Sequence, residues 1–227
     1  MSELVENFAL YLEMDRNLSP HTVKAYEKDL RQFCEVVPGV EFERVSFLHI
    51  RRFLSHLTQA GCERTTIARK VAALRAFFRF LIRERIIQAD PMVGVSTPKL
   101  KHRLPKYLED DEVKRLLELP FEGPIGQRDR AILEVMIASG LRVSEVSALT
   151  FSQLDLAEGE IRVLGKGNKE RLALLGRSAL AALDSYLKEG RNSLLLEKTD
   201  RIFLNRDGGG LQARSIARML VKRAREA

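Results

Sequence analysis

Residues 94–106 divide the chain into two parts of different character. This segment, GVSTPKLKHRLPK, has two prolines, four Lys or Arg residues, no acidic residue and no helical periodicity. Because proline does not continue a helix or a central strand, no regular element is expected to run through it. Boundaries between domains commonly fall in such segments. We therefore expect a domain over 1–93, a basic linker over 94–106 and a second domain over 107–227. The candidate phosphate contacts of the linker are Lys99, Lys101 and Arg103.

The composition is typical of globular domains. Hydrophobic residues make up 45% and charged residues 30% of the 227 residues. The longest apolar runs fall far short of the roughly 20 residues that a bilayer span needs, and the N-terminal segment lacks the features of a secretory signal. Cys34 and Cys62 lie far apart and outside any CxxC pattern, as expected of reduced thiols. We therefore expect a cytoplasmic protein with no membrane partner.

The first domain is predicted to be a bundle of helices separated by stop signals. Ser19-Pro20 combines an N-cap with a proline at the first helical position, and Pro38-Gly39 ends that helix. Gly61 is suited to a left-handed C-cap. The expected helices cover residues 2–14, 20–36 and 47–59, and a fourth that is capped by Thr65 or Thr66 and runs to about Ile87.

The fourth helix is predicted to have one apolar and one basic face. Residues 61–85 carry seven basic and two acidic side chains, whereas residues 1–60 carry seven basic and nine acidic ones. A solvated helix surface is one interpretation, although such surfaces usually mix both signs. A basic wall that contacts the backbone of duplex DNA is the other. The candidate DNA contacts are Lys24, Lys28 and Arg31 on the second helix and Arg69, Arg75, Arg79 and Arg83 on the fourth.

The second domain is predicted to combine short helices with a small antiparallel sheet. Two strands are expected on either side of the turn at 165–169, which is rich in residues that accept a positive φ. Gly140 is expected to end an apolar helix. The expected helices cover about 110–119, 127–139, 143–149, 178–188 and 213 to the end, and the expected strands cover 159–164, 170–174 and 201–205.

Several common catalytic sites do not fit this sequence. The turn GKGNKE lacks the spacing and the hydroxyl residue of a Walker A loop. Neither the four histidines nor the two cysteines have the spacing of metal ligands. There is no GxSxG motif, and no histidine follows residue 102, which argues against a Ser-His-Asp site. We therefore expect no metal and no nucleotide cofactor.

Arg142, Glu145 and Lys166 are the remaining candidates for chemistry. Gly140 ends one helix and Arg142 begins the next, which places a guanidinium beside free backbone N–H groups that favour an anion. Glu145, one turn further on, can hold Arg142 in place. Lys166 lies in the predicted hairpin turn, from which a long cationic side chain can reach a phosphate. From the residues alone, two other interpretations stay open: Arg142 as a partner in a structural salt bridge, and Lys166 as an ordinary turn lysine without a catalytic role.

Four motifs resemble those of the Xer-type tyrosine site-specific recombinases of the phage-integrase family, most closely its XerC-like members. They are, in chain order, NLSPHTVKAYEKDLRQF, RTTIARKVAALRAFFRFL, ASGLRVSEVSALTFSQLDL and VLGKGNKERLALLG. The resemblance covers essentially the whole chain. It implies a mainly α fold, with a four-helix SAM-like core-binding domain followed by an incomplete α/β catalytic domain that is mostly helical and has a small antiparallel sheet.

The resemblance also implies roles for individual residues. Family members clamp double-stranded DNA and cleave it through a covalent 3′-phosphotyrosine, without a metal or a nucleotide. By motif, Arg142 would stabilise charge on the scissile phosphate, and Lys166 would act as general acid on the departing 5′-oxygen. Glu145 would support the site, and Lys169 of the same turn is a further candidate DNA contact.

One departure from the family pattern is large. The His-x-x-Arg pair, the later His or Trp and the nucleophilic Tyr of the family do not follow Arg142 in this sequence. Tyr186, which does follow it, lies on the apolar face of a predicted helix and is interpreted as a packing residue. We therefore expect a truncated chain that binds DNA and does not cleave it.

The sequence thus predicts a site-specific DNA recombinase that acts in chromosome-dimer resolution or DNA integration. When full length, it would work with a second Xer-type recombinase in a tetrameric synaptic complex. Two alternatives stay open: a naturally short, non-catalytic DNA-binding regulator of recombination, and a basic helical module whose anion is not DNA.

Overall fold

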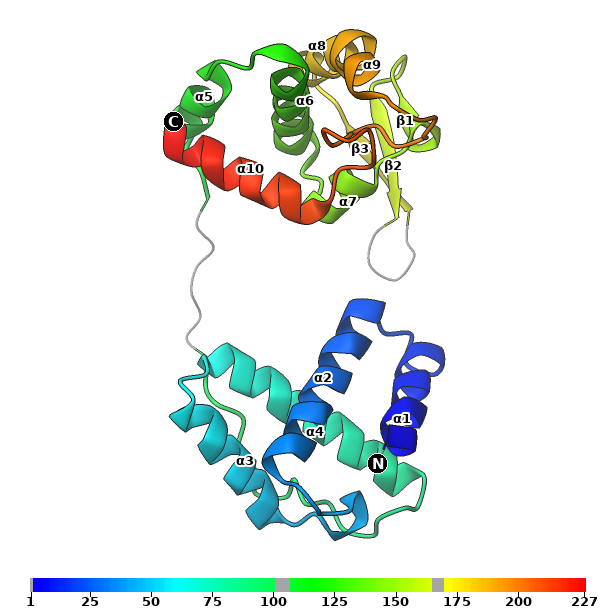
Figure 1. Ribbon diagram of the computed structural model, residues 1–227, viewed down its shortest axis with the longest axis vertical. Coiled ribbons are helices and arrows are strands. Elements are labelled where there is room, and N and C mark those ends of the chain that lie inside the picture. Colours follow the sequence, from blue (N-terminus) through cyan, green and yellow to red (C-terminus); the bar gives the residue numbers. More distant parts are fainter. Residues whose placement is uncertain (1, 101–106, 165–169) are drawn as a thin grey trace. The chain divides into compact units, whose positions relative to one another are not determined.

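The computed structural model describes residues 2–100, 107–164 and 170–227. The chain divides into two compact units, Met1–Leu104 and Pro105–Ala227. The described residues are mostly helical, and a small antiparallel sheet lies in the second unit (Figure 1). None of the described helices is both long enough and apolar enough to cross a membrane. The predicted mainly α fold is confirmed.

Local capping signals set the helix ends in the first unit. Ser19 accepts a hydrogen bond from the Thr22 N–H and is followed by Pro20, so the second helix starts where the cap and the proline predict. At the start of the third helix, Nδ1 of His49 accepts the Ser46 N–H at 3.0 Å. The elements are α1 (Ser2–Met14), α2 (Pro20–Val36), a 3-10 turn η1 (Phe42–Arg44), α3 (Phe47–Gln59) and α4 (Arg64–Arg83) (Figure 1).

The fourth helix differs from its predicted bounds at both ends. It starts at Arg64, ahead of the threonines that were expected to cap it, and it ends at Arg83 rather than near Ile87. Arg85 has a φ of 59°, in the left-handed region, and this turns the chain away from the helix axis. Ile87 then packs into the core and is 8% exposed. Burial of this apolar side chain therefore outweighs continuation of the helix.

Aromatic side chains join the helices of the first unit. The ring of Phe77, on α4, meets Phe8 of α1 at 5.2 Å and Phe42 of η1 at 4.6 Å, both in edge-to-face geometry. Phe33 of α2 and Phe53 of α3 make a similar contact at 5.3 Å. Each such pair contributes about 0.5–1.5 kcal/mol beyond the burial of its surface. The apolar face of α4 is thus part of the core, as predicted.

The second unit packs its helices against a three-stranded antiparallel sheet of order β1-β2-β3. Ile161 lies opposite Ala173 across the two longer strands, and both side chains are buried on the core face. The strands are β1 (Leu154–Asp155), β2 (Glu160–Leu164) and β3 (Glu170–Leu174). The helices are α5 (Asp110–Glu118), α6 (Gly123–Ser139), α7 (Val143–Ala148), α8 (Arg177–Ser185), α9 (Arg191–Leu194) and α10 (Ala213–Glu226), with a 3-10 turn η2 (Phe151–Gln153) before β1 (Figure 1).

The helix predicted over 178–188 is divided. After α8 the chain forms a π-helical turn, η3 (Tyr186–Gly190), which leads into α9. Tyr186 is fully buried and stacks on Phe203 at 5.6 Å. Its hydroxyl donates to the carbonyl oxygen of Ile202 and accepts the Leu204 N–H. Burial raises the pKa of Tyr186. The interpretation of Tyr186 as a packing residue is confirmed.

The prediction of a strand over 201–205 is wrong. Among the described residues, this segment makes isolated bridges, one from Arg201 to Thr150 and one from Leu204 to Gly210. Arg191, which is 6% exposed, donates to the carbonyl oxygens of Thr199, Arg201 and Ile202. An arginine side chain therefore satisfies backbone groups that a neighbouring strand would otherwise pair with.

Candidate anion site and nucleic-acid interface

The turn between α6 and α7 places Arg142 at the surface. Gly140 ends α6 with a φ of 61°, a left-handed conformation that glycine adopts at little cost. Leu141 follows with 3% of its surface exposed and anchors the turn in the core. Arg142 comes directly before α7, and its side chain is 68% exposed. The turn thus presents a guanidinium to solvent from a fixed backbone.

Glu145 holds Arg142 from the first turn of α7. Its Oε1 atom accepts a hydrogen bond from Nη1 of Arg142 at 2.9 Å, and its Oε2 atom accepts the Arg142 backbone N–H at 2.7 Å. The backbone N–H of Arg142 is therefore not available to an anion, whereas its guanidinium is exposed. Burial on its own would raise the pKa of Glu145, but hydrogen bonds from Arg142 and Arg171 outweigh it and hold that pKa below its usual range.

Arg171 on β3 is a member of this cluster that the sequence did not reveal. Its Nη2 atom donates to Oε2 of Glu145 at 2.8 Å, across a separation of 26 residues. No local pattern predicts such a pair. The contact ties α7 to the hairpin of β2 and β3. Lys166 and Lys169 lie in the connection between these strands, outside the described residues, so their roles stay predictions.

Arg69, a predicted DNA contact on α4, has an ion-pair partner within the first unit. Its guanidinium forms an ion pair with Asp29 of α2, whose side chain is 1% exposed. Lys70, with a side chain 7% exposed, contacts the other carboxylate oxygen at 2.7 Å. Arg69 lies on the basic face of α4 with its side chain 42% exposed, and its role as a DNA contact stays a prediction. The periodicity gave the direction of the side chain correctly, but it cannot show a carboxylate on the neighbouring helix.

Two further arginines of α4 have partners inside the first unit. Arg75 donates to Oγ1 of Thr97 and to the carbonyl oxygen of Val95, each at 3.0 Å. It therefore holds the start of the linker against α4. Arg83 donates to Asp15 at 3.2 Å, in a pair that is half-exposed. A DNA phosphate would have to compete with these partners.

The other described candidates remain available at the surface. Arg31 makes one marginal contact, with Glu27 at 4.0 Å. Lys101 and Arg103 lie outside the described residues. The exposed candidates that form no ion pair or side-chain hydrogen bond with another described residue are Lys24, Lys28, Arg79 and Lys99. These four cations are thus the predicted DNA contacts of the first unit that are free of such partners among the described residues, and their role in DNA binding stays a prediction.

The outer face of α10 is basic and is absent from the predicted sites. Ile216 is fully buried, and Met219 and Leu220 pack against the same core. The opposite face surrounds Val221, which is 53% exposed. Its cations are Arg214, Arg218, Lys222 and Arg225. Glu226 lies among them and pairs with Lys222 at 3.8 Å, so the face keeps an excess of positive charge. Their spacing of three or four residues is a sequence signal from which this face could have been predicted.

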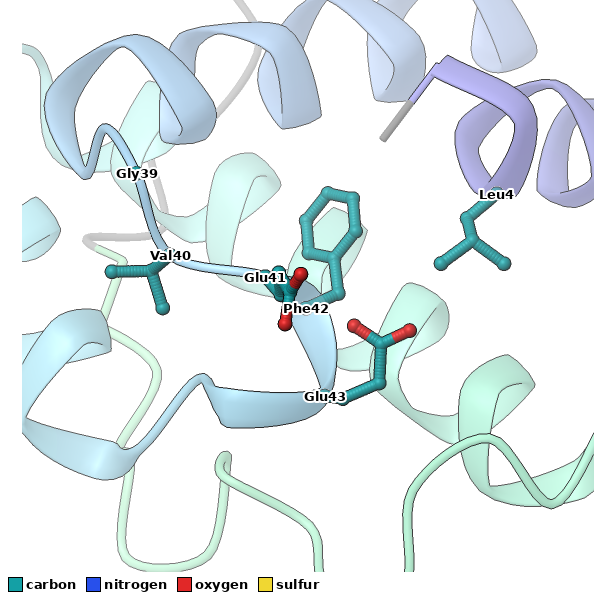
Figure 2. Close-up of a pocket in the computed structure, with 6 residues that line it drawn as sticks. All are labelled: Leu4, Gly39, Val40, Glu41, Phe42 and Glu43. Carbon is teal, nitrogen blue, oxygen red and sulfur yellow. The ribbon is translucent and has the colours of Figure 1, made fainter.

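A hollow of about 390 Å³ in the first unit has the wrong charge for a phosphate. It lies beside η1, and Glu41 and Glu43 line it (Figure 2). Leu4, Val40 and Phe42 supply its apolar surface. Two carboxylates repel a phosphate group, so this hollow is not part of the candidate interface.

Comparison with known families covers both units. Residues 5–85 match the phage integrase N-terminal SAM-like domain, and residues 106–227 match the phage integrase family. Tyrosine recombinase XerC of Pelotomaculum thermopropionicum is 40% identical over 236 residues, which cover 96% of this chain and 76% of that protein. Tyrosine recombinase XerD of Halalkalibacterium halodurans is 39% identical over 230 residues, with 97% and 76% covered.

The same fold occurs in a crystal structure of a lambda integrase dimer bound to a COC′ core site. The TM-score is 0.74 at 18% sequence identity, and the match covers 99% of this chain and 77% of that chain. The structure thus defines an integrase fold with an arginine-carboxylate cluster at the surface. From the matched domains and the identity with XerC and XerD, the chain belongs to the phage integrase family of tyrosine recombinases.

Proposed function

We propose that this chain acts in site-specific DNA recombination, in chromosome-dimer resolution or DNA integration. The observation that carries the proposal is the contact between Arg142 and Glu145, which holds an exposed guanidinium in one orientation. A preorganised cation of this kind stabilises negative charge as it develops on a phosphate. In this proposal Arg142 binds the scissile phosphate and Glu145 orients Arg142. Lys166 would protonate the departing 5′-oxygen when a tyrosine attacks the phosphorus, and this sequence does not supply that tyrosine, so this chain is proposed to bind DNA without cleaving it.

The proposed partner is double-stranded DNA, with a second Xer-type recombinase in a tetrameric complex. The exposed cations of the first unit and the basic face of α10 support the DNA partner. So does the similarity of fold to a lambda integrase dimer bound to DNA. We place the division between the domains within residues 94–106, and we propose a cytoplasmic location, which the two free cysteines support.

Selection from a random-sequence library of DNA duplexes tests this function. We expect the bound duplexes to converge on one site, because recombination at a defined site requires that base edges or DNA shape be read. Arg142→Ala should bind the selected duplex more weakly and select the same sequence, since a phosphate contact carries no sequence information. Arg177→Ala removes another exposed arginine of the second unit and should change neither property. Failure of the wild-type chain to enrich any sequence would contradict site-specific recombination.

A further inference from the structure

Two guanidinium groups share the carboxylate of Glu145. Nη1 of Arg142 contacts Oε1 at 2.9 Å, and Nη2 of Arg171 contacts Oε2 at 2.8 Å. The exposed fraction of the side chain rises from 12% at Glu145 to 38% at Arg171 and 68% at Arg142. The carboxylate therefore lies innermost, and Arg142 is the member of the cluster that is most accessible to a ligand.

The charges of these three groups do not cancel. Arg142 and Glu145 on their own would form a neutral pair, and a neutral pair attracts an anion weakly. Arg171 adds a positive charge, so that the cluster keeps a net charge of +1. Because Arg171 and the Arg142 backbone N–H both donate to Oε2, the carboxylate is also prevented from turning toward the Arg142 side chain with both oxygens.

We propose that Arg171 is a positioning residue for the anion site. It engages one oxygen of Glu145, so that Glu145 orients the Arg142 guanidinium without neutralising the cluster. It also fixes the first turn of α7 to β3, the strand that follows the connection containing Lys166. This inference rests on the proposed function, since it takes Arg142 to be a ligand of a phosphodiester.

A small phosphodiester tests this inference without knowledge of the DNA site. Dimethyl phosphate is titrated into the whole chain, and binding is followed by the ¹H–¹⁵N signal of the Arg142 guanidinium. We expect Arg171→Met, which keeps an apolar stem and loses the hydrogen bond to Glu145, to weaken binding by about three- to tenfold, because both oxygens of Glu145 can then turn toward the Arg142 guanidinium and compete with the anion. Arg171→Lys keeps the charge and should recover most of the affinity. Arg162→Met removes an exposed arginine of the neighbouring strand β2 and is the matched control.

A double-mutant cycle with Glu145→Gln separates positioning from direct contact. If Arg171 acts through Glu145, Arg171→Met should have little effect once the carboxylate is gone. An undiminished effect in that background would show that Arg171 acts on the anion directly, by contact or through its own charge, and would overturn the proposal. Equal affinities of Arg171→Met and the wild type, or equal losses for Arg171→Met and Arg171→Lys, would overturn it as well.

A replacement variant and a parallel measurement of DNA binding complete the experiment. If Arg171→Met does not fold, as judged by circular dichroism, Arg171→Gln takes its place in every comparison. Binding of duplex DNA by the wild-type chain is measured in parallel. A wild type that binds no duplex contradicts the proposed function, whereas a wild type that binds duplex but shows no effect of Arg171→Met contradicts this inference alone.

Discussion

Lys70 donates a hydrogen bond to Asp29 across 2.7 Å, and both side chains are buried between α4 and α2. The second oxygen of Asp29 is paired with Arg69. Removal of one partner of a buried ion pair leaves an uncompensated charge in a poorly solvated place. This cluster therefore fixes the two helices that carry most of the candidate DNA contacts of the first unit.

We predict that Asp29→Ala lowers the free energy of unfolding of the first unit by about 3–5 kcal/mol, because it leaves Lys70 buried without its carboxylate. Urea denaturation followed by circular dichroism measures this change. Asp15→Ala is the matched control, since it breaks a half-exposed pair with Arg83 and should cost less than about 1 kcal/mol. Equal losses in the two variants would show that the Asp29 cluster contributes no more than a surface pair.

A second prediction separates two arginines of α4 that the sequence pattern treats alike. Arg69→Ala should lower the free energy of unfolding by about 1–2 kcal/mol, because its hydrogen bond to a buried carboxylate is lost. Arg79→Ala should change stability by less than about 0.5 kcal/mol and should weaken duplex binding, since its charge is exposed. Thermal melts and DNA titrations of both variants provide the measurement. Destabilisation by Arg79→Ala would mean that the basic wall is wrongly assigned.

The contrast between Arg69 and Arg79 shows what sequence reasoning could and could not reach. Caps and periodicity are local signals, so α2 begins at Pro20 and α3 ends just before Gly61, as predicted. The partner of Arg69 lies 40 residues away on another helix, and no local signal identifies it. Likewise, the segment at 201–205 has the composition of a strand, but the side chain of Arg191 donates hydrogen bonds to the carbonyl oxygens of Arg201 and Ile202.

The contacts of the candidate site also differ in whether the sequence could predict them. Arg142 and Glu145 are three residues apart at a helix start, so their contact could be anticipated from spacing. Arg171 reaches the same carboxylate from a strand, which requires the tertiary fold. The basic face of α10 is a different case. Its cations lie at helical spacing, and their position could have been derived from the sequence.

A third prediction concerns the start of the linker. Arg75→Ala should increase the rate of tryptic cleavage after Lys99 by about fivefold or more, because two hydrogen bonds that hold Val95 and Thr97 are lost. Mass spectrometry of a digestion time course measures the rate. Arg79→Ala removes a neighbouring arginine of the same helix and should leave it unchanged. An unchanged rate in Arg75→Ala would show that Arg75 does not restrain the linker.

A fourth prediction follows from the depressed pKa of Glu145. A carboxyl group whose pKa is lower in the folded than in the unfolded state adds stability above its unfolded pKa of about 4.3, and that stability is lost as the pH falls through the folded value. Glu145→Gln should therefore be clearly less stable than the wild type at pH 7, and the difference should shrink toward pH 3. Free energies of unfolding at both pH values measure this.

Glu158→Gln serves as the control for that comparison. Its side chain is exposed and forms no ion pair among the described residues, so the substitution should change stability little at either pH. A stability difference between the wild type and Glu145→Gln that stayed constant from pH 7 to pH 3 would contradict the role of the carboxylate in the cluster.

The salt dependence of binding to duplex DNA tests the central claim, that the exposed cations of this chain contact the phosphate backbone. We predict that log K falls steeply and linearly with the logarithm of the salt concentration, with a slope of about −0.9 for each phosphate contacted. Arg218→Glu on α10 should make the slope shallower by about one contact. An affinity that is insensitive to salt, or equal for the duplex and for a neutral polymer, would contradict the account.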